Sequence, residues 1–113
     1  MSQPTSKPNK HILEQLDDVI TERKAEDADT SYVAALFDKG LEQIQKKVNE
    51  ESLEAILAAE QDDQQALVSE VADLWFHTMV LLAYKNASIT DVLDELEQRF
   101  GVSGIEEKAS RTK

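Results

Sequence analysis

The sequence predicts an all-α fold, a helical bundle with a central antiparallel pair of helices. Apolar residues recur at helical spacing along most of its 113 residues. Only three glycines and two prolines are present, which disfavours an all-β sandwich because that fold needs turn residues every few positions. There is no cysteine, so disulfides, thiolate metal sites and a cysteine nucleophile are excluded. A chain of this length typically forms one domain with its own core.

The chain begins with a polar segment and then becomes helical. Residues 1–9 contain both prolines and show no periodicity, which indicates a flexible tail before one domain that spans residues 10–113. A first amphipathic helix is expected from about Lys10 to Asp27. Its apolar positions are Ile12, Leu13, Leu16, Val19 and Ile20.

A short helix and a long helix are expected next. Thr30 or Ser31 can cap the short helix, and Gly40 marks the break that follows it. The long helix is expected from about Leu41 to Gln61. The apolar positions of the short helix are Tyr32, Val33, Leu36 and Phe37, and those of the long helix are Leu41, Ile44, Val48, Ala55 and Ala59.

The fourth expected helix, from about Asp63 to Asn86, contains the most apolar stretch of the chain. Asp62 and Gln65 form a predicted capping box at its start. At about 100° per residue its apolar side chains surround the helix, a pattern typical of a buried helix. Glu70 and Asp73 lie near the middle of the apolar stretch and make it a poor membrane span.

A fifth helix is expected to end near Phe100. Ser88 and Asp91 form the predicted capping box at its start. Its inward positions are Ile89, Val92, Leu93 and Leu96. Gly101 ends the helical pattern, and a tail over residues 103–113 follows.

The formal net charge of −11 limits the classes of partner. An acidic field repels nucleic acid and anionic lipid, because both are bound through cations that face phosphates. The same field suits a metal cation. The first residues lack the apolar segment of a secretory signal. We therefore expect a cytoplasmic protein that binds neither nucleic acid nor membrane.

Two pairs of acidic residues occupy positions that the helical pattern assigns to apolar faces. Glu70 and Asp73 fall, with His77, within one arc of the fourth helix. Glu51 falls inside the apolar arc of the third helix, and Glu54 lies beside it at i+3. The predicted turn between the two helices is midway between the pairs, so a hairpin brings all four carboxylates level. Because like charges in a buried setting cost several kcal/mol, we expect a cation among them.

Oxygen ligands without cysteine favour a hard divalent ion, Mg²⁺, for which Mn²⁺ can substitute. The alternatives are a solvated carboxylate cluster, or a cluster paired with Lys47 one turn before Glu51. His77 is open to three interpretations: an interior residue, a residue that orients a carboxylate, or a contact with substrate.

Several segments resemble known families. EESLE at 50–54 and EVAD at 70–73 resemble the metal signature of the all-α nucleoside-triphosphate pyrophosphatases, the MazG-like superfamily. Four longer segments are similar to the phosphoribosyl-ATP pyrophosphohydrolase family: SYVAALFDKG at 31–40, KKVNEESLEAILAA at 46–59, EVADLWFH at 70–77 and RFGVSGIEEKASR at 99–111. This resemblance extends from about Ile12 to Arg111.

The resemblance implies hydrolysis of 1-(5-phosphoribosyl)-ATP to 1-(5-phosphoribosyl)-AMP and pyrophosphate, the second step of histidine biosynthesis. It implies a homo-oligomer, at least a dimer, in which a second chain completes the helical bundle. It also implies that the cyclohydrolase of the next step, which acts on phosphoribosyl-AMP, is a separate protein.

Within this reading, the expected ligands of one or more Mg²⁺ ions on the substrate polyphosphate are Glu51, Glu54, Glu70 and Asp73. A carboxylate of Glu50, Glu51 or Glu54 is expected to orient the attacking water and to take its proton. The candidates for contacts with the substrate are Lys47, His77, Arg99, Lys108 and Arg111. The tail over 103–113 is either a solvated terminus or a segment that closes over the phosphates, and the resemblance favours closure.

Two other functions remain open at this stage. One is a house-cleaning pyrophosphatase of the same superfamily that acts on nucleoside or deoxynucleoside triphosphates. The other is a non-catalytic helical interaction module, in which the acidic cluster is only structural.

Overall fold

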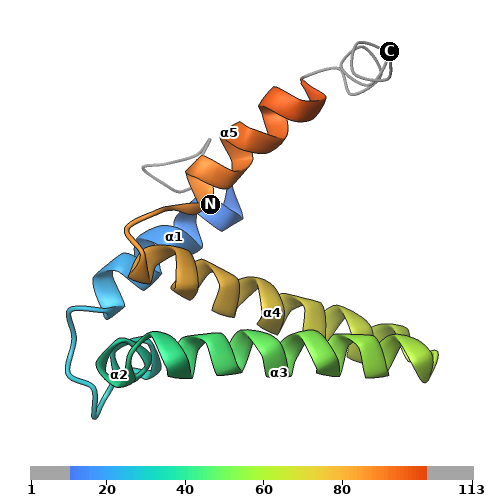
Figure 1. Cartoon of the computed structure of the whole chain (residues 1–113), viewed down its shortest axis with the longest axis horizontal. Helices are drawn as coiled ribbons and strands as arrows, with labels where there is room; N and C mark the ends of the chain where they lie inside the picture. Colours follow the sequence, from blue (N-terminus) through green and yellow to red (C-terminus); the bar gives the residue numbers. More distant parts are fainter. Residues whose placement is uncertain (1–10, 102–113) are drawn as a thin grey trace, which may run out of the picture.

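A computed structural model describes residues 11–101, and these residues form five α-helices without a strand among them. The helices are α1 (Ile12–Arg23), α2 (Tyr32–Lys39), α3 (Leu41–Glu60), α4 (Gln64–Tyr84) and α5 (Ile89–Phe100), shown in Figure 1. The prediction of an all-α fold is therefore confirmed. The expected tails over 1–9 and 103–113, with Lys108 and Arg111, lie outside the described residues.

Side chains cap the helices where the sequence offers them. The predicted capping box at the start of α5 is present, with Ser88 as N-cap and Asp91 as its partner. Ser31 caps α2. The start of α1 has a capping box that the sequence pattern did not reveal. His11 Nδ1 accepts a hydrogen bond from the backbone N–H of Leu13, and Glu14 Oε1 accepts one from the backbone N–H of His11.

The turn between α3 and α4 is where the sequence places it, but the predicted cap at Asp62 with Gln65 is wrong. Asp62 has a φ of 61°, the left-handed conformation that ends α3 and reverses the chain. This conformation passes the N-cap position to the next residue. The Asp63 Oδ1 atom accepts a hydrogen bond of 3.0 Å from the backbone N–H of Ala66.

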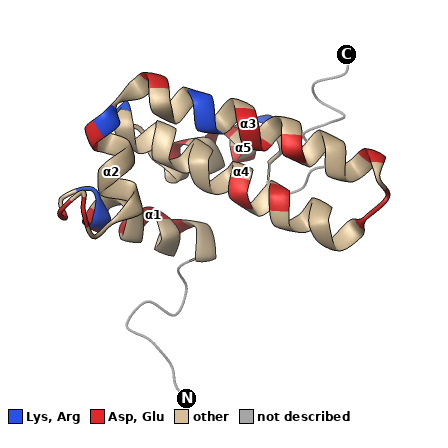
Figure 2. Cartoon of the chain, turned by 90° about the horizontal axis from the view of Figure 1, so that it is seen from below, with Lys and Arg blue, Asp and Glu red and all other residues tan. Residues whose placement is uncertain are grey.

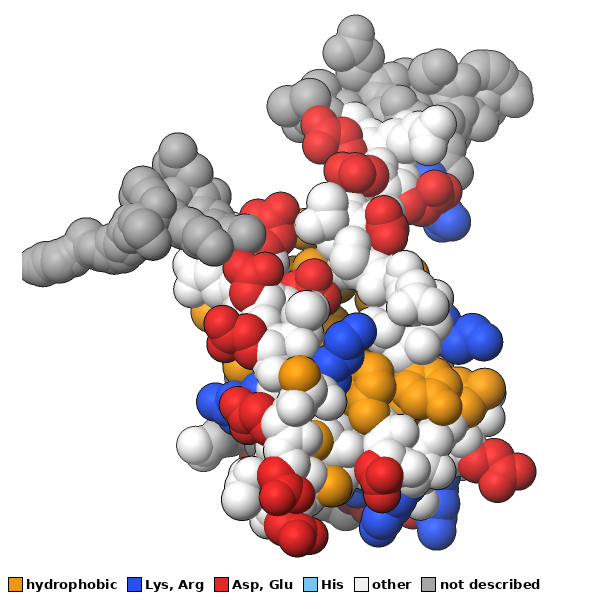
Figure 3. All heavy atoms as spheres, turned by 90° about the vertical axis from the view of Figure 1, so that its left-hand side faces the viewer, with side chains coloured by type: hydrophobic (Ala, Val, Ile, Leu, Met, Phe, Trp, Pro, Cys, Tyr) orange, Lys and Arg blue, Asp and Glu red, His pale blue; other side chains and the backbone are white. Residues whose placement is uncertain are grey.

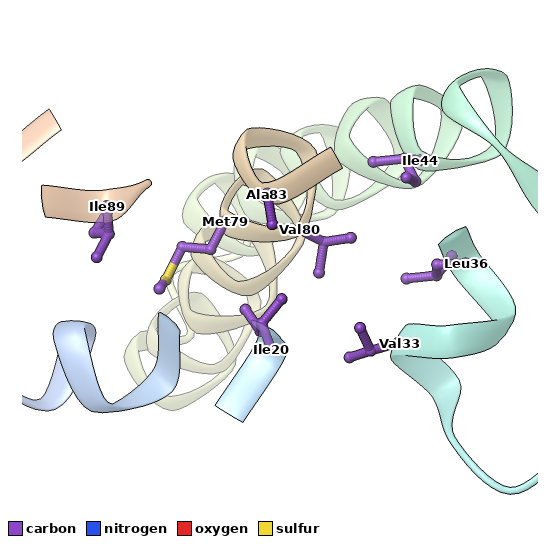
Figure 4. Packing of buried hydrophobic residues seen from close by; sticks show 8 residues of the cluster. All are labelled: Ile20, Val33, Leu36, Ile44, Met79, Val80, Ala83 and Ile89. Atoms are coloured by element: carbon purple, nitrogen blue, oxygen red, sulfur yellow. The ribbon is translucent and has the colours of Figure 1, made fainter. Parts of the chain in front are cut away.

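The most extensive helix packing in the described chain is between α3 and α4. Figure 1 shows them side by side and running in opposite directions, with α1 and α2 toward one end of the pair and α5 projecting away from it. The core lies where the helices meet at that end (Figure 4). Its buried members are Ile20, Val33, Leu36, Ile44, Met79, Val80, Ala83 and Ile89.

The expectation that α4 is buried on all sides is wrong for the described chain. Val68 is 62% exposed and Trp75 is 53% exposed, because α1 and α3 cover only part of the helix surface. Within the described residues, α4 is the one helix long and apolar enough to cross a membrane by length and composition alone. Two carboxylates on α4, those of Glu70 and Asp73, cluster with a carboxylate of α3. The helix therefore has exposed apolar side chains as well as carboxylates that meet α3.

The core at one end of the α3–α4 pair leads to a testable prediction about stability. Ile44 is fully buried, so Ile44→Ala should lower the free energy of unfolding by about 2–5 kcal/mol through lost burial and the cavity it leaves. Ile12→Ala is the matched control, because Ile12 is 65% exposed, and should change it by less than about 1 kcal/mol. Urea denaturation followed by circular dichroism measures both. Equal losses in the two variants would contradict this assignment of the core.

Candidate metal centre

Three carboxylates from two helices meet halfway along the α3–α4 pair. One carboxylate oxygen from each of Glu51, Glu70 and Asp73 lies within 4.8 Å of the other two. We call these residues the acidic triad. Glu70 and Asp73 share a face of α4 because they are three residues apart, and the hairpin places Glu51 of α3 opposite them. Figure 2 shows acidic positions of the two helices next to each other.

The triad differs from the expected group of four buried carboxylates in two respects. Glu54 is exposed and is not a member of the cluster. The setting is also more open than expected, since Asp73 is exposed while Glu51 and Glu70 are half-buried. The physical reason is that α1 and α2 pack toward one end of the pair (Figure 1), so the described chain covers the triad, which lies halfway along the pair, only in part.

The electrostatics of the triad show that its negative charges repel each other. Partial burial first, and then the negative charges of Glu51, Glu54 and Asp73, raise the pKa of Glu70 above its ordinary value. A hydrogen bond between protonated Glu70 and Glu51 raises this pKa further. Glu54 therefore lies within electrostatic reach of the triad. A hard divalent cation bound among these carboxylate oxygens would relieve the same repulsion.

Lys47 neutralises part of this charge. Its Nζ atom lies 3.7 Å from Glu51 Oε2 and 3.5 Å from Glu50 Oε1. Among residues 11–101, Lys47 is the basic residue that forms an ion pair with a member of the triad, Glu51. One ammonium group cannot balance three carboxylates. Pairing of the carboxylates with Lys47, the alternative to a metal ion, is thus present in the structure. It leaves a net negative charge at the triad.

His77 is buried beside the triad, and both of its ring nitrogens have partners. Nδ1 lies 2.8 Å from the backbone oxygen of Asp73, and Nε2 lies 2.8 Å from the hydroxyl of Tyr32. A carbonyl oxygen only accepts, so Nδ1 carries the proton and Nε2 accepts the Tyr32 O–H. This arrangement leaves no ring nitrogen for a direct bond to a substrate. Of the three interpretations of His77, this arrangement favours a residue that orients its neighbours.

The structure also places two residues away from where the sequence suggested. Arg99 donates a hydrogen bond of 2.9 Å from Nε to Glu95 Oε2, and α5 projects away from the triad (Figure 1). Tyr32 is expected on the apolar face of a short helix, yet its hydroxyl reaches His77. Its sequence position gives no signal of this contact, which depends on how α2 packs beside α4.

Acidic side chains extend beyond the triad. Figure 3 shows them spread over one end of the molecule, with fewer basic side chains and a patch of exposed apolar ones. The chain carries a formal net charge of −11. A polyphosphate that approaches such a surface is repelled unless cations intervene.

Comparisons with known proteins identify close relatives. A family model described as phosphoribosyl-ATP pyrophosphohydrolase matches residues 13–100. A phosphoribosyl-ATP pyrophosphatase of Hydrogenovibrio crunogenus is 52% identical over 106 residues, which cover 90% of this chain and 94% of the relative. Proteins of the same name are similar in Neisseria gonorrhoeae, with 50% identity over 89% of this chain and 94% of the relative, and in Methylococcus capsulatus, with 49% identity over 88% and 95%.

Repulsion within the triad predicts how Glu70→Gln affects the metal-free protein. Because the fold raises the pKa of Glu70, the stability that this group contributes is present at low pH and is lost as the pH rises through the raised pKa. A neutral glutamine removes that loss. We therefore expect the variant to melt at a higher temperature than the wild type at neutral pH in EDTA, with a smaller decline from acidic to neutral pH.

Thermal melts followed by circular dichroism test this prediction. Glu60→Gln is the control, since it removes an exposed carboxylate at the far end of α3, and should give a smaller increase. A lower melting temperature for Glu70→Gln at neutral pH would show that the carboxylate is stabilised in the metal-free fold.

Proposed function

The chain belongs to the phosphoribosyl-ATP pyrophosphohydrolase family, and from this premise we propose that it hydrolyses 1-(5-phosphoribosyl)-ATP to 1-(5-phosphoribosyl)-AMP and pyrophosphate, the second step of histidine biosynthesis. A water oxygen bonds to the α-phosphorus while the α–β anhydride bond breaks, and pyrophosphate leaves. The observation that supports this proposal is the acidic triad, whose three carboxylate oxygens lie within 4.8 Å of one another.

We propose that the triad holds Mg²⁺, for which Mn²⁺ can substitute. The donors are all carboxylate oxygens, the ligand type that these ions prefer, and their mutual repulsion favours a cation. When bound, the ion neutralises phosphate charge and polarises the anhydride. Glu51, Glu70 and Asp73 supply the ligands in this proposal. We propose that the exposed Glu54, whose charge reaches Glu70, turns toward the ion and completes the set.

The neighbouring glutamates of α3 are suited to handling the attacking water. Glu50, Glu51 and Glu54 lie within about one turn of the helix. We propose that a carboxylate oxygen of this group orients the water and takes its proton. Glu51 and Glu54 are nearest to the triad, whereas Glu50 is exposed and pairs with Lys47.

Basic side chains complete the proposed site. Lys47 already lies at the triad, where its ammonium group can contact a phosphate. Lys108 and Arg111 belong to the tail over 103–113, which we propose closes over the phosphates. Arg99 belongs to α5, which projects away from the α3–α4 pair (Figure 1), and we propose that it contacts substrate at the site of a second chain. His77 serves the site by orienting groups and not by binding substrate.

A second copy of the chain is the proposed partner of the exposed apolar surface. Large apolar side chains of α3 and α4 are at least two-fifths exposed: Leu53, Ile56, Leu57, Val68 and Trp75. Trp75 also borders a groove of about 220 Å³ between α4, α1 and α5. Exposed apolar patches of this kind mark interaction sites. We propose that the two copies form a bundle with the antiparallel α3–α4 pairs at its centre.

We place this reaction in the cytoplasm, with a separate phosphoribosyl-AMP cyclohydrolase consuming the product. A house-cleaning pyrophosphatase acting on nucleoside triphosphates would use the same triad. Substrate preference distinguishes the two functions.

Purified protein is expected to release pyrophosphate from phosphoribosyl-ATP with Mg²⁺ or Mn²⁺, and to stop in EDTA. Asp73→Asn should lower turnover by about 100-fold or more, because a lost ligand removes several kcal/mol of transition-state stabilisation. Asp38→Asn is the matched control, since Asp38 is exposed on α2, and should leave turnover unchanged. Coupled pyrophosphate detection measures the rates.

Three outcomes would contradict the proposal. Release of single phosphates would exclude a pyrophosphohydrolase. Faster turnover of dUTP or dCTP than of phosphoribosyl-ATP in the same buffer would indicate the house-cleaning function. No turnover and no rise in melting temperature with Mg²⁺ would indicate an interaction module, because a ligand that binds the native state raises the melting temperature.

The proposed assembly predicts a mass of at least twice 12.7 kDa in sedimentation at micromolar concentration. Trp75→Glu should reduce this mass to that of one chain, since a charge would be buried against the partner. Ile12→Glu adds the same charge at an exposed apolar position of α1 and should leave the mass unchanged. A wild-type protein that sediments as a single chain would exclude the assembly.

A further inference from the structure

Tyr32 is held in a fixed position next to the acidic triad. It is the first residue of α2 and is 52% exposed. Its ring stacks on Phe76 with centroids 6.3 Å apart, and its hydroxyl donates to His77 Nε2 at 2.8 Å. Contacts to the ring and to the hydroxyl together leave this side chain little freedom, although half of its surface faces solvent.

Two hydrogen bonds in series connect Tyr32 to the turn of α4 that carries Asp73. His77 is only 6% exposed, and its Nδ1–H donates to the backbone oxygen of Asp73 at 2.8 Å. Asp73 supplies one of the triad carboxylates. The tautomer that makes this bond is the one whose Nε2 accepts from Tyr32, so the tyrosine hydroxyl selects it. A single side chain therefore separates Tyr32 from the helical turn that carries Asp73.

The charges of α3 also act on Tyr32. The hydroxyl oxygen keeps its lone pairs after it donates to His77. Burial raises the pKa of Tyr32, while the charge of Lys47 lowers it and that of Glu51 raises it. The negative charge of an ionised Tyr32 is the first cause that raises the pKa of Lys47, against the effect of burial. Tyr32 and Lys47 therefore lie within electrostatic reach, and Lys47 Nζ is 3.7 Å from Glu51 Oε2.

We propose that Tyr32 is a positioning residue of the metal centre, whose hydroxyl fixes the His77 ring and, through it, the turn of α4 that carries Asp73. The inference rests on the proposed function only in that the triad binds a divalent cation. Groups that orient metal ligands typically change metal affinity by about 10–100-fold when they are removed. Tyr32 has this role for Asp73, on which it acts through His77.

The test is Tyr32→Phe, which removes the hydroxyl and keeps the ring on Phe76. We expect its Kd for Mn²⁺, measured by calorimetry in the absence of substrate, to rise about 10-fold or more. The electron paramagnetic resonance spectrum of bound Mn²⁺ should also change. The melting temperature in EDTA should stay close to that of the wild type. Tyr84→Phe is the matched control, because Tyr84 packs on Phe37 with ring centroids 5.5 Å apart, and its Kd should be unchanged.

His77→Asn provides a second variant on the same path. An asparagine amide can keep an N–H donor toward the Asp73 oxygen but is too short to accept from Tyr32. Its Kd should therefore rise as in Tyr32→Phe. The double variant should bind Mn²⁺ no more weakly than the weaker single variant, because both changes break one link.

A Kd for Tyr32→Phe within twofold of the wild-type value overturns this inference and leaves the proposed function intact. The same is true if the melting temperature in EDTA falls while the Kd stays constant, since that result indicates a purely structural hydroxyl. A wild-type protein that neither binds Mn²⁺ nor hydrolyses phosphoribosyl-ATP overturns both proposals.

Discussion

The site depends on the register that one short turn imposes on α3 and α4. Asp62 reverses the chain in a left-handed conformation, and Asp63 starts the next helix. This turn places Glu51 opposite Glu70 and Asp73, although nearly twenty residues separate them in the sequence. Hydrophobic packing between the helices holds the register against the repulsion of the carboxylates. The fold thus keeps a cluster that its own electrostatics disfavour, as expected of a site that is completed by a cation.

The composition of α4 reflects three different environments around one helix. Its C-terminal half supplies Met79 and Val80 to the core, and its first half supplies two carboxylates to the triad. A third surface exposes Val68 and Trp75. In an isolated chain this apolar surface faces water, whereas the proposed bundle of two chains would bury it. The acidic triad and the proposed interface therefore lie on the same helix. His77, which is buried in the protein interior, bonds the backbone oxygen of Asp73.

Local patterns were sufficient to predict the five helices, the Ser88 cap and the hairpin, because periodicity and capping are properties of neighbouring residues. They also brought together the three members of the triad. They failed where packing decides. Asp62 and Asp63 are equivalent cap candidates until the backbone conformation is known. Spacing at i+3 could not show that Glu54 is exposed while the carboxylates of Glu51, Glu70 and Asp73 meet. The role of the Tyr32 hydroxyl likewise depends on where α2 packs.

The most direct test of the central claim is a double-mutant cycle on Mn²⁺ affinity with Glu51→Gln and Asp73→Asn. If carboxylates from the two helices share one ion, each single variant loses most of the affinity and the double variant loses little more, which is a strong coupling between the helices. Losses that are small in both single variants, or that simply add in the double variant, would mean that the register of α3 and α4 does not create a common metal site.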